Sequence, residues 1–287
     1  MLKRIITAAV ALAVFIGVLL LPPIVFTIAL AAVIMLMLYE CYTATKADCK
    51  MRVVGFISAA LLILTMGGVG GMKSLGFIFI YIAATMVLLL YMALAIFEHG
   101  KRSYKDVLSS GFLTMYIAVA MWCIIYIKDF FGVEVMLLVF ISAWSCDTFA
   151  YFSGYFLGRH KLIPHVSPKK TIEGSIGGVL GAVACCTVYL FILSKLTASS
   201  VSEFSSIAYT FNKSFLIWYM GAGLLGGIFS QFGDLAASAI KRDEGIKDFG
   251  WIFPGHGGFL DRFDSILYVA PIILMWTVFC QTLGLTY

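Results

Sequence analysis

The chain has 287 residues, of which 62% are hydrophobic and 12% are charged, and its formal net charge is +5. Its mean hydropathy is +1.01. The long apolar runs behind these values exclude a soluble fold. We expect no nucleic-acid partner.

Apolar runs long enough to cross a bilayer recur along the whole chain. A membrane-spanning helix needs about 20 mostly apolar residues. We therefore predict an all-α polytopic membrane protein with nine transmembrane helices. The first run follows Lys3 and Arg4 as a signal peptide would, but Pro22 and Pro23 come after it instead of a small-residue cleavage site, so we expect it to be retained. The nine predicted ranges are 5–21, 24–39, 53–69, 75–97, 108–127, 135–157, 174–194, 214–240 and 265–285.

The basic residues orient these helices. If the N-terminus is cytoplasmic, every Lys and Arg except Lys73, Lys128, Lys195 and Lys213 falls on the cytoplasmic side, as the positive-inside rule requires. An odd number of spans then places the C-terminus outside. We divide the chain into N-terminal transmembrane helices without a motif, 1–134, and a C-terminal transmembrane catalytic region, 135–287.

Charged side chains concentrate between the eighth and ninth predicted helices. The stretch 238–264 reads SAIKRDEGIKDFGWIFPGHGGFLDRFD, and Asp234 lies just before it. Charges are costly near a bilayer, so a dense cluster of both signs beside two apolar helices indicates a functional site. For any single residue, the alternative is an ion pair that anchors the loop at the membrane surface.

Helix geometry brings three carboxylates of this region to one depth. With a rise of about 1.5 Å per residue, Asp234 lies roughly 30 Å along the eighth helix from its outer end. Asp261 and Asp264 lie at the start of the ninth helix, at the same cytoplasmic edge. We predict that these three carboxylates hold a divalent cation, and that the absence of thiolates from this set favours magnesium over zinc.

A second polar cluster lies upstream. Asp147 falls about 18 Å from the outer end of its helix, where an acid needs a partner or a wet cavity. We predict that it lines a polar pocket opening toward the cytoplasmic leaflet without being a primary metal ligand. The alternative is a hydrogen-bonded structural acid. Ser167, Lys169 and Lys170 precede a helix N-terminus, which favours anions, although both lysines could instead serve topology alone.

The spacing of these residues resembles the signature of phosphatidate cytidylyltransferases (CDP-diacylglycerol synthases). The pattern S-x-x-K-R-x4-K-D-x-G-x3-P-x-H-G-G-x2-D-R-x-D begins at Ser238, and the elements D-T-x-A-Y at Asp147 and S-P-K-K-T-x-E-G at Ser167 also match. The resemblance covers residues 140–265, whereas the N-terminal helices match only in being hydrophobic. It implies that CTP and phosphatidate react to give CDP-diacylglycerol and pyrophosphate, with Mg2+, a K+ partner and a homodimer.

The resemblance and the residue chemistry together assign roles in the site. We expect an integral protein of a bacterial inner (cytoplasmic) membrane, with the active site facing the cytoplasm. The predicted catalytic residues are Asp234, Asp261, Asp264, Lys241 and Arg242, and the three aspartates are the metal ligands. The predicted substrate-binding residues are Ser238, Lys247, His256, Gly257, Gly258, Arg262, Ser167, Lys169, Lys170 and Asp147.

Two alternative functions stay open at this point. A cation-coupled transporter would use Asp147 and Asp234 to bind the coupling ion, but it has no need of a cytoplasmic basic cluster. A CTP-dependent lipid or polyprenol kinase is chemically closer, because it binds the same nucleotide. The D-G-x2-A-R-x8-G-x3-D-x3-D pattern of CDP-alcohol phosphatidyltransferases is absent from this sequence.

Overall fold

The protein is predominantly helical, as the hydropathy pattern predicts. The computed structural model describes residues 13–19, 22–67, 76–98, 101, 103–198, 209, 211–253 and 257–285. Residues 13–19 are helical. The labelled helices are α2 (Pro23–Ala44), α3 (Cys49–Gly67), α4 (Gly76–Phe97), α5 (Tyr104–Phe131), α6 (Val133–Leu157), α7 (Ile172–Ala198), α8 (Lys213–Asp243) and α9 (Leu260–Thr282).

Each of the nine predicted ranges contains helix among the described residues. Within the described ranges, six helices are long and apolar enough to cross a membrane: α2, α5, α6, α7, α8 and α9. The chain is therefore an integral membrane protein. The number of nine crossings and the orientation of the termini stay predictions.

A short β-hairpin departs from the expected all-α fold. Strands β1 (Lys161–Ile163) and β2 (Ser167–Thr171) pair antiparallel, with Lys161 opposite Thr171 and Ile163 opposite Ser167. The carboxylate of Glu173 accepts hydrogen bonds from the backbone N–H groups of Arg159 and His160, which draws the two ends of the hairpin together. Pairing satisfies backbone groups that an open loop would leave to water.

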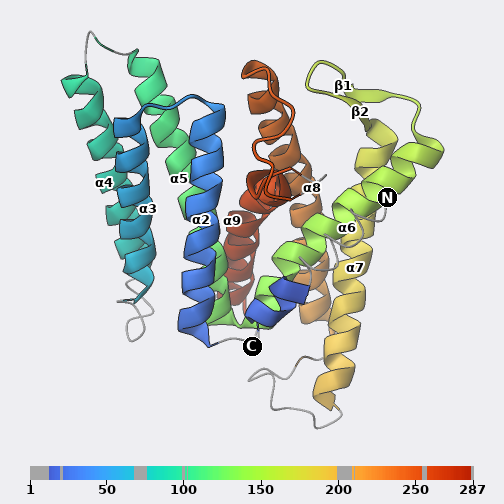
Figure 1. Ribbon diagram of the computed structural model, residues 1–287. Helices are drawn as coiled ribbons and strands as arrows, with labels where there is room; N and C mark the ends of the chain where they lie inside the picture. The colour runs from blue at the N-terminus through green and yellow to red at the C-terminus, as the bar shows by residue number, and fades with distance from the viewer. Residues whose placement is uncertain are drawn as a thin grey trace. The chain divides into compact units, whose positions relative to one another are not determined.

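Close packing divides the chain into two compact units. Unit 1 comprises residues 1–130 and 241–263, and unit 2 comprises residues 131–240 and 264–287. Residues 241–263, which belong to the signature, pack with the N-terminal helices. The functional division at 134/135 stays a prediction. Within unit 1, α2, α3, α4 and α5 lie side by side (Figure 1).

In unit 2, α8 is packed closely against three other helices. A Cβ at Gly226 would lie 2.4 Å from the Ser142 hydroxyl oxygen of α6, and one at Gly223 would lie 2.7 Å from Val183 Cα of α7. On α9, the Trp276 indole N–H donates to the Trp218 carbonyl oxygen of α8 at 2.8 Å. Figure 1 shows α6 running at an incline across α7, with the β1–β2 hairpin extending beyond both. Such tight helix contacts through small residues are typical of membrane bundles.

Candidate active site

The loop between α8 and α9 is organised around Asp261. One carboxylate oxygen of Asp261 accepts backbone hydrogen bonds from Phe249 at 2.8 Å and Gly258 at 3.0 Å. The other oxygen lies 2.8 Å from Lys241 Nζ. Asp261 is 7% exposed, so a buried carboxylate is satisfied by two backbone donors and one ammonium group. The Lys241 ammonium also lies over the Phe249 ring, 5.3 Å from its centroid.

The glycines of the H-G-G element allow this loop to turn tightly. Gly257 has φ +82°, a backbone conformation that favours glycine. The Gly257 carbonyl oxygen accepts a hydrogen bond from Phe253 N–H at 2.9 Å. The rings of Phe253 and Phe259 pack edge to face, with their centroids 4.7 Å apart. His256, a predicted substrate-binding residue, lies outside the described residues.

A residue that sequence reasoning missed lies beneath this loop. Glu40 of α2 is 3% exposed, and its carboxylate accepts hydrogen bonds from the backbone of Phe259 and Leu260. A signal for it was available, because Glu40 is an acid that directly follows the apolar predicted span 24–39. The contact links the signature to a region where no motif was found.

In unit 2, an ion pair joins two motifs that are far apart in sequence. Lys170 Nζ on β2 lies 2.6 Å from a carboxylate oxygen of Asp234 on α8. The Ser238 hydroxyl, one turn along α8, donates to the other oxygen of Asp234 at 3.3 Å. The structure therefore brings together three residues that were predicted from separate patterns.

Asp234 and Asp264 flank a close contact between the backbones of α8 and α9. A Cβ at Gly233 would lie 2.5 Å from the Asp264 carbonyl oxygen and 2.8 Å from Ser265 Cα, so glycine alone lets the backbones meet. Asp234 follows Gly233 directly, while the Asp264 carboxylate accepts a hydrogen bond from Ser265 N–H at 2.8 Å. The packing of these two backbones thus places two acidic residues at one helix junction.

The described residues can be tested for their fit to a divalent cation. Across the described part of the chain, no three His, Cys, Asp or Glu side chains group closely enough to hold an ion on their own. Magnesium at nucleotide sites, however, takes one or two carboxylates together with substrate phosphates. Asp234 and Asp264, which flank the backbone contact at Gly233, offer carboxylate oxygens, the donors that such a site requires. Whether Asp261 also contacts a metal stays a prediction.

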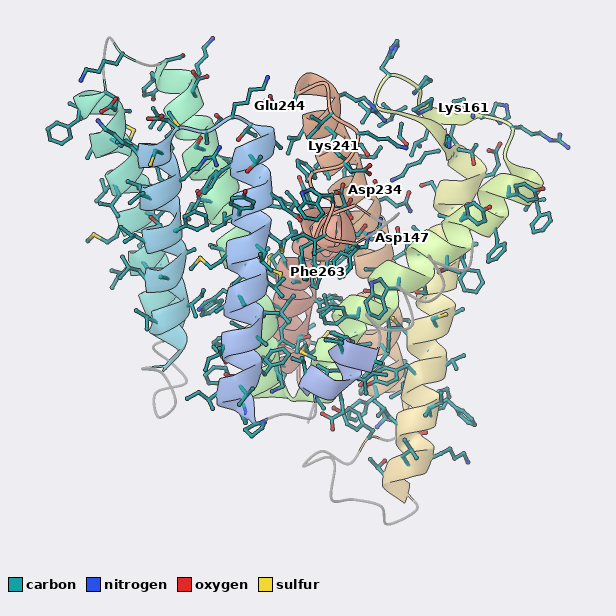
Figure 2. The ribbon with its side chains drawn as sticks, in the orientation of Figure 1. Asp147, Lys161, Asp234, Lys241, Glu244 and Phe263 are labelled. Carbon is teal, nitrogen blue, oxygen red and sulfur yellow. The ribbon has the colours of Figure 1, made fainter. Side chains whose placement is uncertain are left out.

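A polar contact between α6, α7 and α8 lies next to Asp147. The Gln231 side-chain amide donates to the Ser175 carbonyl oxygen at 3.0 Å, and the Ser175 hydroxyl donates to Gln231 Oε1. The Cys146 thiol donates to the Gly227 carbonyl oxygen at 3.2 Å. Sequence reasoning missed Ser175 and Gln231, because single neutral polar residues are common in transmembrane helices. Asp147 on α6 is exposed, and Figure 2 labels it together with Asp234 on α8.

The remaining predicted site residues are mostly at the surface. Ser167 is half-buried on β2, and Gly257 and Gly258 form the turn before α9. Among the predicted site residues, the exposed cationic side chains are those of Arg242, Lys247, Arg262 and Lys169. A cationic side chain exposed beside an organised loop is available to an incoming phosphate.

Comparison with known proteins identifies the relatives of this chain. The sequence model of the cytidylyltransferase family matches residues 2–280. A phosphatidate cytidylyltransferase of Thermotoga maritima is 36% identical over 169 residues, which cover 59% of this chain and 58% of that protein. The Staphylococcus haemolyticus protein of the same name is 35% identical over 192 residues, covering 67% of this chain and 66% of the relative.

A third relative gives the same picture. The phosphatidate cytidylyltransferase of Bacillus subtilis is 37% identical over 168 residues, covering 57% of this chain and 56% of the relative. These matches therefore extend over somewhat less than two thirds of the relatives' own lengths.

Proposed function

Because this chain belongs to the cytidylyltransferase family, we propose that it is a phosphatidate cytidylyltransferase. It joins CTP and phosphatidate to form CDP-diacylglycerol and pyrophosphate. The observation that carries the proposal is the ion pair of Lys170 with Asp234. That pair unites the S-P-K-K-T element with the helix that opens the main signature, as a single nucleotide site requires.

The reaction is a displacement at phosphorus. A phosphate oxygen of phosphatidate attacks the α-phosphorus of CTP, a new P–O bond forms, and the bond to the bridging oxygen breaks as pyrophosphate leaves. A lipid phosphate monoester is already ionised at neutral pH, so the site needs little general-base help. Its main task is to offset repulsion between two anions.

The described side chains are suited to that task. Lys170 and Ser238 hold Asp234 in a defined orientation before substrate arrives. Lys241 is fixed between Asp261 and the Phe249 ring, and the exposed Arg262 and Lys247 can bind phosphate oxygens. A magnesium ion held by Asp234 and Asp264 with the nucleotide would neutralise phosphate charge.

The proposal includes the finer predictions on topology and partners. It places nine spans in a bacterial inner membrane, with the N-terminus and the site on the cytoplasmic side and the C-terminus outside. The support is the distribution of Lys and Arg, together with the cytoplasmic location of CTP. A K+ partner and a homodimer are proposed from the resemblance alone.

Position-specific labelling of CTP tests the function against its alternatives. Purified protein is incubated with magnesium, with CTP that is labelled at either the α- or the γ-phosphorus, and with phosphatidate or, in parallel, a lipid alcohol (diacylglycerol or a polyprenol) as the acceptor. We expect the α-label to enter the lipid and the γ-label to leave as pyrophosphate. Entry of the γ-label into lipid would instead show a CTP-dependent kinase, and a transporter would incorporate neither label. Asp234→Asn is the control and should abolish most incorporation.

A further inference from the structure

The start of α9 is held by a carboxylate from a distant helix. Glu40 of α2 accepts hydrogen bonds from the N–H groups of Phe259 at 3.1 Å and Leu260 at 2.9 Å. Since α9 begins at Leu260, these are backbone donors that the helix cannot satisfy internally. A carboxylate at a helix N-terminus also interacts favourably with the helix dipole.

Glu40 also accounts for two glycines of the signature. A Cβ at Gly250 or at Gly258 would lie 2.3 Å from a Glu40 carboxylate oxygen. Any larger residue at either position would displace the carboxylate or the loop. The loop backbone therefore closes directly on Glu40 from two sides, at the K-D-x-G element and at the H-G-G element.

The residues that contact Glu40 adjoin those that orient Asp261. Phe249 and Gly258 donate to Asp261, while their neighbours Gly250 and Phe259 lie against Glu40. A shift of the loop away from Glu40 would therefore move the backbone donors that fix the Asp261 carboxylate. Lys241, which pairs with Asp261, would lose its orientation as well.

We infer that Glu40 is a positioning residue for cytidylyl transfer: its carboxylate shapes the signature loop and thereby sets the orientation of Asp261 and Lys241. The inference rests on the proposed function. Glu40 acts through the backbone, since the contacts it makes are with loop N–H groups and glycines. Its loss should therefore lower kcat more than it raises KM for CTP.

The first test is Glu40→Gln, which keeps the side-chain length but replaces one acceptor oxygen by an NH2 group that cannot accept. One of the two N–H groups at the start of α9 then loses its partner. We expect kcat to fall at least tenfold, which corresponds to about 1.4 kcal/mol in the barrier. Amide hydrogen exchange of a peptide covering residues 257–263 should accelerate. Glu98→Gln is the matched control, because Glu98 is also a buried acid of unit 1 but pairs with Lys50; it should change neither quantity.

A double-mutant cycle tests the contact itself. Gly258→Ala alone should lower kcat, because its new Cβ meets the Glu40 carboxylate. In a Glu40→Ala background that clash is gone. The factor by which Gly258→Ala lowers kcat should therefore be at least about threefold smaller there, a coupling within the range seen for contacting residues.

Wild-type kcat and wild-type exchange in Glu40→Gln, or strictly additive effects in the cycle, would overturn the inference. Absence of any CMP transfer by the wild-type protein would refute the proposed function instead. The exchange measurement would still decide whether Glu40 holds the loop.

Discussion

Gly233 is a position of the site where the backbones of two helices leave no room for a side chain. Its missing side chain lets α8 meet the backbone of Asp264 and Ser265, and an added Cβ would lie 2.5 Å from the Asp264 carbonyl oxygen. Ordinary contacts of this kind begin at 3.4 Å. Gly233→Ala therefore has to separate the two backbones by about 0.9 Å, the difference between these values.

A displacement of that size acts directly on the junction that places Asp234 and Asp264. Overpacking of a tight contact typically costs about 1–3 kcal/mol of stability. A misplacement of about 1 Å in a catalytic constellation can cost roughly a hundredfold in rate. We therefore expect Gly233→Ala to fold with a moderately lower melting temperature in detergent, and kcat for CMP transfer to fall by about two orders of magnitude.

The matched control is Gly223→Ala on the same helix. A Cβ at Gly223 would lie 2.7 Å from Val183 Cα in the backbone of α7. Gly223, however, lies ten residues, about 15 Å, from Gly233 along α8. It should lose a similar amount of stability and retain most of its activity per folded molecule. Equal activities of the two variants, or wild-type kcat in Gly233→Ala, would refute the reasoning.

Three further predictions concern other parts of the molecule. Asp147→Asn should keep measurable activity with an unchanged magnesium dependence, and a tenfold higher magnesium requirement would make Asp147 a metal ligand. A cysteine at Gly245, in a background without native cysteines, should resist impermeant reagents added to intact cells; labelling from outside would reverse the topology. The Lys50 ammonium holds the pKa of Glu98 below its ordinary value of 4.5. The Lys50–Glu98 ion pair therefore stabilises the folded state at pH values above 4.5. That contribution is lost as the pH falls through the lower pKa that Glu98 has in the folded state. The melting temperatures of wild type and Glu98→Gln should therefore converge at acidic pH, and a difference that persists there would contradict this account.

Two ion pairs of the structure involve predicted catalytic and substrate-binding residues. Lys241 forms an ion pair with Asp261, and Lys170 forms one with Asp234, so these charged side chains do have partners within the protein. Such pairing keeps buried or half-buried charges compensated before substrate binds. It is compatible with catalysis, because a lysine that neutralises a carboxylate can turn to a phosphate when the nucleotide brings its own charge.

The sequence by itself determined the helical membrane architecture and the position of the signature. Both are local properties: a spanning helix needs about 20 apolar residues in a row, and the charges of 238–264 stand out against that background. The β1–β2 hairpin escaped prediction because its strands are only a few residues long, too short for a periodic pattern to be distinctive.

Tertiary structure alone decided which groups each charge meets. No local pattern connects Glu40 with the backbone of Leu260, which lies 220 residues further along the chain. The spacing of residues along the sequence also does not show that Lys170 forms an ion pair with Asp234, or that the Asp264 backbone packs directly against Gly233. Hydropathy acts on each helix separately, whereas these contacts depend on how closely the helices approach, and small residues at particular crossings set that approach.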